Sequence, residues 1–250
     1  MRKINKIKIG VMPAAGFGRR ISNLPLTKIL PKPLLPILNK PIMEYGIDNM
    51  KQLGVETVYI IVSDVTKLIR KYFGDGSDFG VNIKYVTQPI QKNFGLADAI
   101  GLTANYITEP FCIILGDDLT LAKSLDNLLI DFWSKDAKIL EGVVIEKDKE
   151  KIKQSCSVNL DSTGKIINIE EKPNNTYSEI RGCGIYICHP IVYSFINKTP
   201  ISQKCGEREF TTTLQLIANE NLAYGSFING KNININRLCD LTEAIKLMFL

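Results

Sequence analysis

The sequence predicts an α/β fold with a Rossmann-like, mostly parallel mixed sheet and helices on both faces. Strand-like runs alternate with helix-like stretches through the first half of the chain, which is the pattern of a parallel sheet covered by helices. Short, partly alternating strands fill much of the second half. Because no proline- or serine-rich linker and no internal repeat divides the 250 residues, we expect one domain over residues 1–250.

The first half is expected to contain strands and helices in strict alternation. The first two helical stretches end at Gly54 and Gly74, where a glycine commonly stops a helix. The strands are predicted at residues 7–12, 58–62, 81–86 and 111–115, and the helices at residues 42–53, 65–73 and 96–107. In sheets of this kind ligands lie beyond the carboxyl ends of the strands. A glycine-rich loop and the segment Gly116-Asp117-Asp118 both follow predicted strands.

The second half reads as shorter strands followed by helices. A turn at residues 161–164 separates two of the strands. The strands are predicted at residues 139–146, 157–160, 166–170, 184–188 and 223–228, and the helices at residues 191–196, 213–219 and 241–250.

Composition and charge exclude several classes of protein. The six cysteines form no C-x-x-C pair and only one histidine is present, so we expect neither a zinc site nor a disulfide framework. No apolar run reaches the roughly 18 residues of a membrane span, and no signal peptide is recognisable, so we expect a cytoplasmic protein. Residues 1–40 contain nine Lys or Arg and no acid, which fits either a solvated basic face, a common feature, or a site for a polyanion.

The glycine loop does not have the spacing of the common nucleotide-binding motifs. Gly16 and Gly18 follow a predicted strand, and glycines there let backbone amides approach a phosphate or a base. A dinucleotide-binding loop needs a third small residue where Ile21 stands, and the P-loop pattern occurs nowhere. An arginine pair and a proline-rich segment, TKILPKPLLP, follow instead, and the prolines stiffen a loop that can present a lysine to a triphosphate.

The motifs AAGFGRR, PKPLLPI and NKP resemble those of the sugar-1-phosphate nucleotidyltransferases of the glucose-1-phosphate thymidylyltransferase and UTP–glucose-1-phosphate uridylyltransferase type. The similarity continues in family order through FGDGSDFG, QP, GLADAI, LGDD, EEKP and GIY. The resemblance implies a nucleotide-binding half over about residues 1–135 and a sugar-binding half over about residues 136–250. The implied partners are a nucleoside triphosphate and a sugar 1-phosphate, with no nucleic acid and no membrane; a homo-oligomer is compatible with it.

The implied reaction joins two anions, because a sugar phosphate oxygen attacks the α-phosphorus of the triphosphate and pyrophosphate leaves. The protein must therefore neutralise charge and align the phosphates. The resemblance assigns catalytic roles to Arg20 and Lys32, and it makes Asp117 a ligand of Mg²⁺. Asp118 is expected to support or cap and not to hold the metal itself.

The resemblance assigns the remaining site residues to two groups. The nucleotide-binding group is Ala14, Ala15, Gly16, Gly18, Gln88 and Gly95, and the sugar-phosphate-binding group is Glu171, Lys172 and Gly184. The base stays open, because the connection over residues 89–94 is about two residues longer than in typical thymidylyltransferases. UTP or dTTP and glucose 1-phosphate are the favoured substrates.

Two positions depart from the family pattern. Counting seven residues back from Leu241 places Asn234 where the family has a second metal-binding Asp, and Thr212 stands where it has another Asp. An amide binds Mg²⁺ less strongly than a carboxylate, so a binding-only regulatory module on the same fold remains an alternative. A cytidylyltransferase for an alcohol phosphate such as phosphocholine is a further alternative, and a dehydrogenase is the least favoured.

Overall fold

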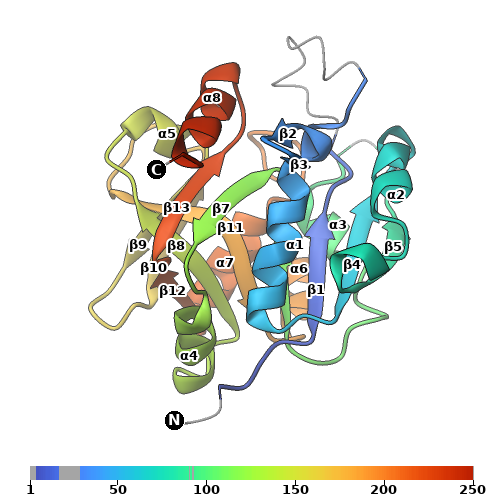
Figure 1. The fold of residues 1–250 in the computed structure, drawn as a ribbon. Helices are drawn as coiled ribbons and strands as arrows, with labels where there is room; N and C mark the ends of the chain where they lie inside the picture. Colours follow the sequence, from blue (N-terminus) through green and yellow to red (C-terminus); the bar gives the residue numbers. More distant parts are fainter. Residues whose placement is uncertain (1–3, 17–28, 90, 92, 250) are drawn as a thin grey trace.

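A nine-stranded mixed sheet forms the centre of the structure, a computed structural model that describes residues 4–16, 29–89, 91 and 93–249 (Figure 1). Its main path has the order β10-β9-β11-β6-β1-β4-β5, and β8 lies between β11 and β12. The strands are β1 (Ile9–Pro13), β4 (Thr57–Val62), β5 (Asn82–Thr87), β6 (Phe111–Ile114), β8 (Ile139–Ile145), β9 (Cys156–Leu160), β10 (Ile166–Glu171), β11 (Ile180–Cys188) and β12 (Ala223–Phe227).

The two halves of the chain meet where β11 pairs with β6. Strands β6, β1, β4 and β5 are parallel, whereas β11 runs antiparallel to both β6 and β8. The carboxyl ends of β1 and β6 therefore lie side by side, and the glycine loop and Asp117 follow directly from them. The expected mixed sheet with helices on both faces is confirmed.

Helices cover both faces of the sheet. One face packs against α1 (Ile42–Leu53), α2 (Lys67–Phe73) and α4 (Asp126–Ser134), whose apolar residues join one core cluster. The other face packs against α3 (Leu96–Gly101), α6 (Val192–Lys198) and α7 (Phe210–Asn219), which join a second cluster. Both clusters use the continuous apolar runs of β1, β4 and β6, as expected for strands buried on both faces.

The predicted helices differ in how well their ends were placed. Helix α1 spans the predicted residues, and Gly54, in the left-handed region at φ 96°, ends it. Helix α3 is shorter than predicted, because a series of turns follows Gly101 and the Thr103 hydroxyl donates a hydrogen bond to the Ile100 carbonyl. Helix α4 and the short α5 (Lys149–Lys153) were not predicted.

A two-stranded ribbon outside the main sheet was also missed. Strand β7 (Asp118–Ala122) pairs antiparallel with β13 (Gly230–Asn234), and Figure 1 shows this ribbon beside β11. Leu119, Ile233 and Ile235 on one side of the ribbon join a third core cluster. Its other members come from the segment around β2 (Pro36–Ile37) and β3 (Lys40–Pro41), from α1 and from α8 (Leu238–Leu247).

Most of the cysteines lie in the core of the protein. Four of the six cysteines are buried, all six are free, and only Cys205 and Cys239 are exposed. Among the described residues, no helix has both the length and the apolar character needed to cross a bilayer. The division of the chain into a nucleotide half and a sugar half stays a prediction.

Candidate active site

Lys32 lies buried where the proline-rich segment meets the end of β6. Pro31 and Pro33 flank it in a single 3₁₀ turn, so the backbone there is stiff and cannot extend into a longer helix. The Lys32 side chain is 7% exposed, and its Nζ donates to Asp117 Oδ2 at 2.7 Å and to Asn236 Oδ1 at 3.3 Å. The fold therefore brings two of the predicted site residues, Lys32 and Asp117, into direct contact.

Asp118 and Asn234 face each other across the ribbon. They are directly opposite in the antiparallel ladder of β7 and β13. The Oδ1 atoms of both side chains are buried, and neither has a hydrogen-bond partner among the described residues. Burial, reinforced by the neighbouring charge of Asp117, raises the pKa of Asp118 to about 8, while the charges of Lys32 and Arg181 oppose this rise.

The described part of the glycine loop continues from β1. The Ala14 amide donates to the Ile61 carbonyl at 2.9 Å, and the Ser63 hydroxyl donates to the Ala15 carbonyl at 3.0 Å. Gly16 is exposed, and a Cβ added there would meet no atom within 4 Å. Packing among the described residues therefore does not demand a glycine at position 16, which leaves room beside the backbone for a ligand.

Two of the predicted site residues, Gly18 and Arg20, lie outside the described residues. The described chain resumes at Ile29, three residues before Lys32. The roles assigned to Gly18 and Arg20 stay predictions.

Gln88 and Gly95 lie on either side of the connection between β5 and α3. The backbone N–H of Gln88 donates to the Val62 carbonyl at 2.7 Å, which continues the β4–β5 pairing to the carboxyl end of these strands. Gly95 has a packing reason for its identity, because a Cβ there would lie 2.1 Å from the carbonyl oxygen of Arg208. The Gly95 amide donates to Asp98, and Asp98 in turn forms an ion pair with Arg208 at 2.7 Å.

The predicted sugar-phosphate residues lie at the ends of β10 and in β11. Lys172 Nζ lies 3.0 Å from Glu171 Oε1, and Lys172 adopts a φ of 42°, which is uncommon for a residue with a side chain. Its amide donates to the Ser155 carbonyl at 2.7 Å, which ties this backbone to the start of β9. Gly184 lies beside Asp118 instead: its φ is 65°, and a Cβ there would lie 2.4 Å from Asp118 Oδ2.

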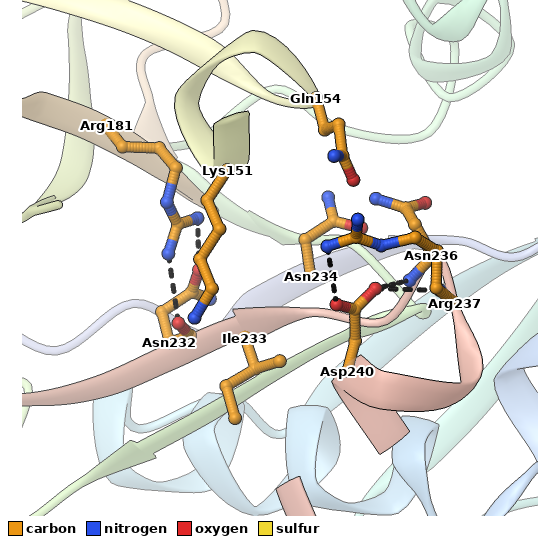
Figure 2. A pocket seen from close by; sticks show the side chains of 9 residues that line it. All are labelled: Lys151, Gln154, Arg181, Asn232, Ile233, Asn234, Asn236, Arg237 and Asp240. Atoms are coloured by element: carbon orange, nitrogen blue, oxygen red, sulfur yellow. Dashed lines mark hydrogen bonds and ion pairs between the residues drawn. The ribbon is translucent and has the colours of Figure 1, made fainter. Parts of the chain in front are cut away.

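The sequence analysis named Asn234 but missed the two asparagines beside it in the same row along β13 and its extension. Asn232, Asn234 and Asn236 alternate with isoleucines that face the third core cluster, so the three amides lie on the opposite side of the strand (Figure 2). Arg181, which is 3% exposed, donates to Asn232 Oδ1 at 2.7 Å and to the Asn232 carbonyl at 2.9 Å. The alternation of Asn and Ile in the sequence was the signal that could have revealed this strand.

A buried acid in β8 was also missed. Glu141 is 0% exposed, and the Cys156 thiol lies 3.6 Å from its Oε1. A Cβ on Gly182 would lie 2.0 Å from the same oxygen, so the carboxyl group fills the space that this glycine leaves. Burial, with a smaller contribution from the charge of Glu171, raises the pKa of Glu141 to about 8.

The residues that could hold Mg²⁺ are oxygen donors at the end of β6 and on the ribbon. Asp117 is half-exposed. Asp118 follows it in the sequence, and Asn234 lies opposite Asp118 in the ladder; each of these two side chains has a buried oxygen without a partner among the described residues. In the part of the chain that the structure describes, no three or more His, Cys, Asp or Glu side chains are grouped so that they could hold a metal ion by themselves. This donor set suits Mg²⁺, which takes one or two carboxylates and completes its shell with phosphate oxygens and water.

The fold and the site together define a class of protein. An α/β sheet with a glycine loop, a buried lysine and adjacent carboxylates at the carboxyl ends of neighbouring strands is suited to binding a nucleotide by its phosphates. The comparison with known proteins agrees: the model of the nucleotidyl transferase family matches residues 9–234. The chain belongs to this family.

Sequence comparison finds relatives that are named as nucleotidyltransferases. The low-salt glycan biosynthesis nucleotidyltransferase Agl11 of Haloferax volcanii is 29% identical over 88% of this chain and 59% of its own length. A glucose-1-phosphate thymidylyltransferase of Streptomyces antibioticus is 27% identical over 92% of this chain and 63% of its own length. The chain therefore spans somewhat more than half the length of these relatives.

Solved structures give the same fold. A protein described as a glucose-1-phosphate thymidylyltransferase from Bacillus anthracis, solved with sucrose, has a TM-score of 0.85 and 25% identity, and the match covers 96% of this chain and 94% of that one. A UDP-glucose pyrophosphorylase complexed with UDP-glucose has a TM-score of 0.84 at 24% identity over 97% of this chain and 98% of the other, which supports the fold alone.

Proposed function

We propose that the protein transfers a nucleotidyl group from a nucleoside triphosphate to a sugar 1-phosphate, releasing pyrophosphate and forming a nucleoside-diphosphate sugar. UTP or dTTP and glucose 1-phosphate are the favoured substrates, because relatives named for these activities match most of the chain. The observation that carries the proposal is the buried Lys32, held between Asp117 and Asn236 at the edge of the sheet where β1 and β6 end.

Lys32 is suited to bringing two anions together. Within the described part of the chain its amino group has one carboxylate partner, Asp117, and a phosphate oxygen can take a further donor position on the same nitrogen. The stiff proline-flanked turn fixes where the nitrogen lies, so little reorganisation is needed when phosphate charge develops. Arg20, on the loop after β1, is proposed to stabilise the leaving pyrophosphate.

Asp117 and Asn234 are proposed to hold Mg²⁺, which when bound would neutralise phosphate charge at this edge of the sheet. Gln88 and Gly95 are proposed to contact the base, since they flank the connection that leaves the sheet beside β4. Glu171 and Lys172 are proposed to contact the sugar and its phosphate. The left-handed backbone of Lys172 supports this role, because strained backbone concentrates at functional sites.

A binding-only module on the same fold is the second candidate, and Asn234 is the observation that favours it. An amide in place of a carboxylate would weaken a metal site that the reaction needs. The two candidates differ in turnover and not in ligand affinity, so binding measurements alone do not separate them.

The deciding experiment is a matrix of pyrophosphate release, with UTP, dTTP, CTP, GTP and ATP crossed against several sugar 1-phosphates and phosphocholine in the presence of Mg²⁺. We expect release with UTP or dTTP and glucose 1-phosphate. Release only with CTP and phosphocholine would identify the alcohol-phosphate cytidylyltransferase instead. Tight nucleotide binding without release in any combination would leave the binding-only module.

A further inference from the structure

We propose that Asp118 supplies the second carboxylate of the Mg²⁺ site, across the β7–β13 ladder from the position that the family fills with an acid. The identity of the metal rests on the proposed function, but the assignment of the ligand comes from the geometry of the ribbon. It also replaces the expectation that Asp118 only supports or caps.

The first argument is the register of the ribbon. Asp118 and Asn234 are direct cross-strand partners. Side chains at such positions point to the same face of the ribbon, with Cβ atoms about 4.5–5.5 Å apart. A carboxylate at 118 with an amide at 234 therefore presents the same two functional groups to one place as an amide at 118 with a carboxylate at 234. Asn234 need not mark a lost metal site, because the acid stands opposite it.

The second argument is that both side chains have an unused oxygen. Asp118 Oδ1 and Asn234 Oδ1 are buried, and no donor within the described ranges reaches either of them. Buried polar atoms without a partner are rare in native proteins, and a buried carboxylate oxygen is especially unfavourable. When Asp118 is ionised, both oxygens are acceptors and neither can donate a hydrogen bond to the other. A cation between them satisfies both.

The third argument is that the surroundings hold this pair in place. Gly184 leaves no room for a side chain beside Asp118, whose Oδ2 would lie 2.4 Å from an added Cβ. On the facing strand, Arg181 fixes Asn232 by two hydrogen bonds (Figure 2). These contacts restrict the space around Asp118 and hold the strand that carries Asn234, which favours a preformed metal site.

The fourth argument concerns Asp117. Its Oδ2 already accepts a hydrogen bond from Lys32 at 2.7 Å. A metal held by Asp117 alone would share its only carboxylate with the ammonium group of Lys32, whose positive charge repels the metal ion. A second carboxylate at 118 offsets that charge and brings the donor set to the one or two carboxylates that Mg²⁺ typically uses in proteins.

The test is direct binding of Mn²⁺, used as a spectroscopic probe in place of Mg²⁺, with free Mn²⁺ followed by electron paramagnetic resonance. The titration uses the whole protein without nucleotide or sugar, so its result does not depend on turnover. We expect Asp118→Asn to weaken Mn²⁺ binding about tenfold or more. The double variant Asp118→Asn with Asn234→Asp, which exchanges acid and amide across the ladder, is expected to restore binding to near the wild-type level.

A matched control and a stability measurement complete the design. Asp136→Asn removes a carboxylate whose side chain is 90% exposed, and it should leave Mn²⁺ binding unchanged. In metal-free buffer Asp118→Asn should unfold at the wild-type temperature or above it, because it removes an ionisable group whose burial is unfavourable, but Mn²⁺ should raise only the wild-type temperature. Equal Mn²⁺ affinity of Asp118→Asn and wild type, no Mn²⁺ binding by the wild type, or a double variant as weak as the single one would overturn the proposal.

Discussion

The Lys32 side chain is only 7% exposed, and its amino group forms an ion pair with the carboxylate of Asp117. Removing a contact that is made to the charge of a transition state typically lowers turnover about a hundredfold or more. We therefore expect Lys32→Ala and Asp117→Ala each to lower kcat by about that factor, measured as pyrophosphate release with both substrates saturating.

The control for this pair is Lys67→Ala, since Lys67 is 77% exposed and far from the site in the sequence. It should keep the wild-type rate. A near-normal rate for Lys32→Ala, in a variant whose circular dichroism spectrum is unchanged, would remove Lys32 from the catalytic machinery and with it the observation that carries the proposed function.

Glu141 predicts a pH dependence of stability. Burial raises the pKa of Glu141 to about 8, whereas the unfolded chain loses the same proton near its ordinary pKa of 4.5. Between these values the folded state binds more protons than the unfolded state, so the free energy of unfolding falls as pH rises, by up to about 1.4 kcal/mol per pH unit. Below pH 4.5 this penalty is absent, and above pH 8 it is complete.

Glu141→Gln removes that titration while keeping the shape of the side chain. Urea unfolding at pH 5 and at pH 8 should show the variant gaining stability relative to the wild type as pH rises. Parallel pH profiles for the two proteins would mean that Glu141 is ionised in the folded state throughout this range.

At the scale of elements, the β7–β13 ribbon depends on Arg181. This side chain supplies two donors to Asn232, so Arg181→Met would leave buried acceptors without partners, at a cost of about 1–3 kcal/mol in the free energy of unfolding. Urea unfolding measures the loss. Lys71→Met is the control: Lys71 is exposed, and its loss should change stability by less than about 0.5 kcal/mol.

The Arg181 variant also tests whether the ribbon positions the site. Because Asn232 and Asn234 lie on one strand, loosening Asn232 should raise the Mg²⁺ concentration needed for half-maximal activity. An unchanged Mg²⁺ requirement in a destabilised variant would mean that Arg181 supports the fold without positioning Asn234.

The elements that the sequence predicted well are those defined by local signals. Helix α1 ends at Gly54 as expected, and the apolar runs of β4 and β6 correspond to buried strands. The β7–β13 ribbon was not predicted, because each of its strands is short and pairs with a strand about 110 residues away in the sequence, as Asp118 does with Asn234. Neither strand has a turn signal that would announce the pairing.

The candidate site divides in the same way. Lys32 and Asp117 could be named from motifs, and the structure brings them together. The Asn236 contact and the pairing of Asp118 with Asn234 could not, since they depend on the register of a non-local ladder. The amide at position 234 by itself indicates a weakened metal site, whereas the ladder places an acid, Asp118, directly opposite Asn234.

At the scale of the whole molecule, the segments around Lys32, Asp117 and Asn234 meet at a core cluster that is smaller than the two main ones. The segment after Lys32, the ribbon and α8 pack together through a third, smaller cluster that includes Leu35, Leu119 and Ile235. Each of these cluster residues is a near neighbour in the sequence of one candidate: Leu35 of Lys32, Leu119 of Asp117, and Ile235 of Asn234. Packing in the third cluster should therefore control the alignment of the site, while packing in the large clusters should control stability alone.

Two identical substitutions separate these roles. Ile235 lies in the third cluster and Ile217 in the cluster beneath α7, and each is 0% exposed. Ile235→Ala and Ile217→Ala should each lower the free energy of unfolding by about 2–5 kcal/mol, because each leaves a similar cavity. Only Ile235→Ala should also lower kcat/KM, by about tenfold or more, since displacements near 1 Å at a reacting centre have effects up to about a hundredfold. The difference is measured as pyrophosphate release at a temperature where both variants are folded. Equal kcat/KM values for the two variants would show that the third cluster does not align the site.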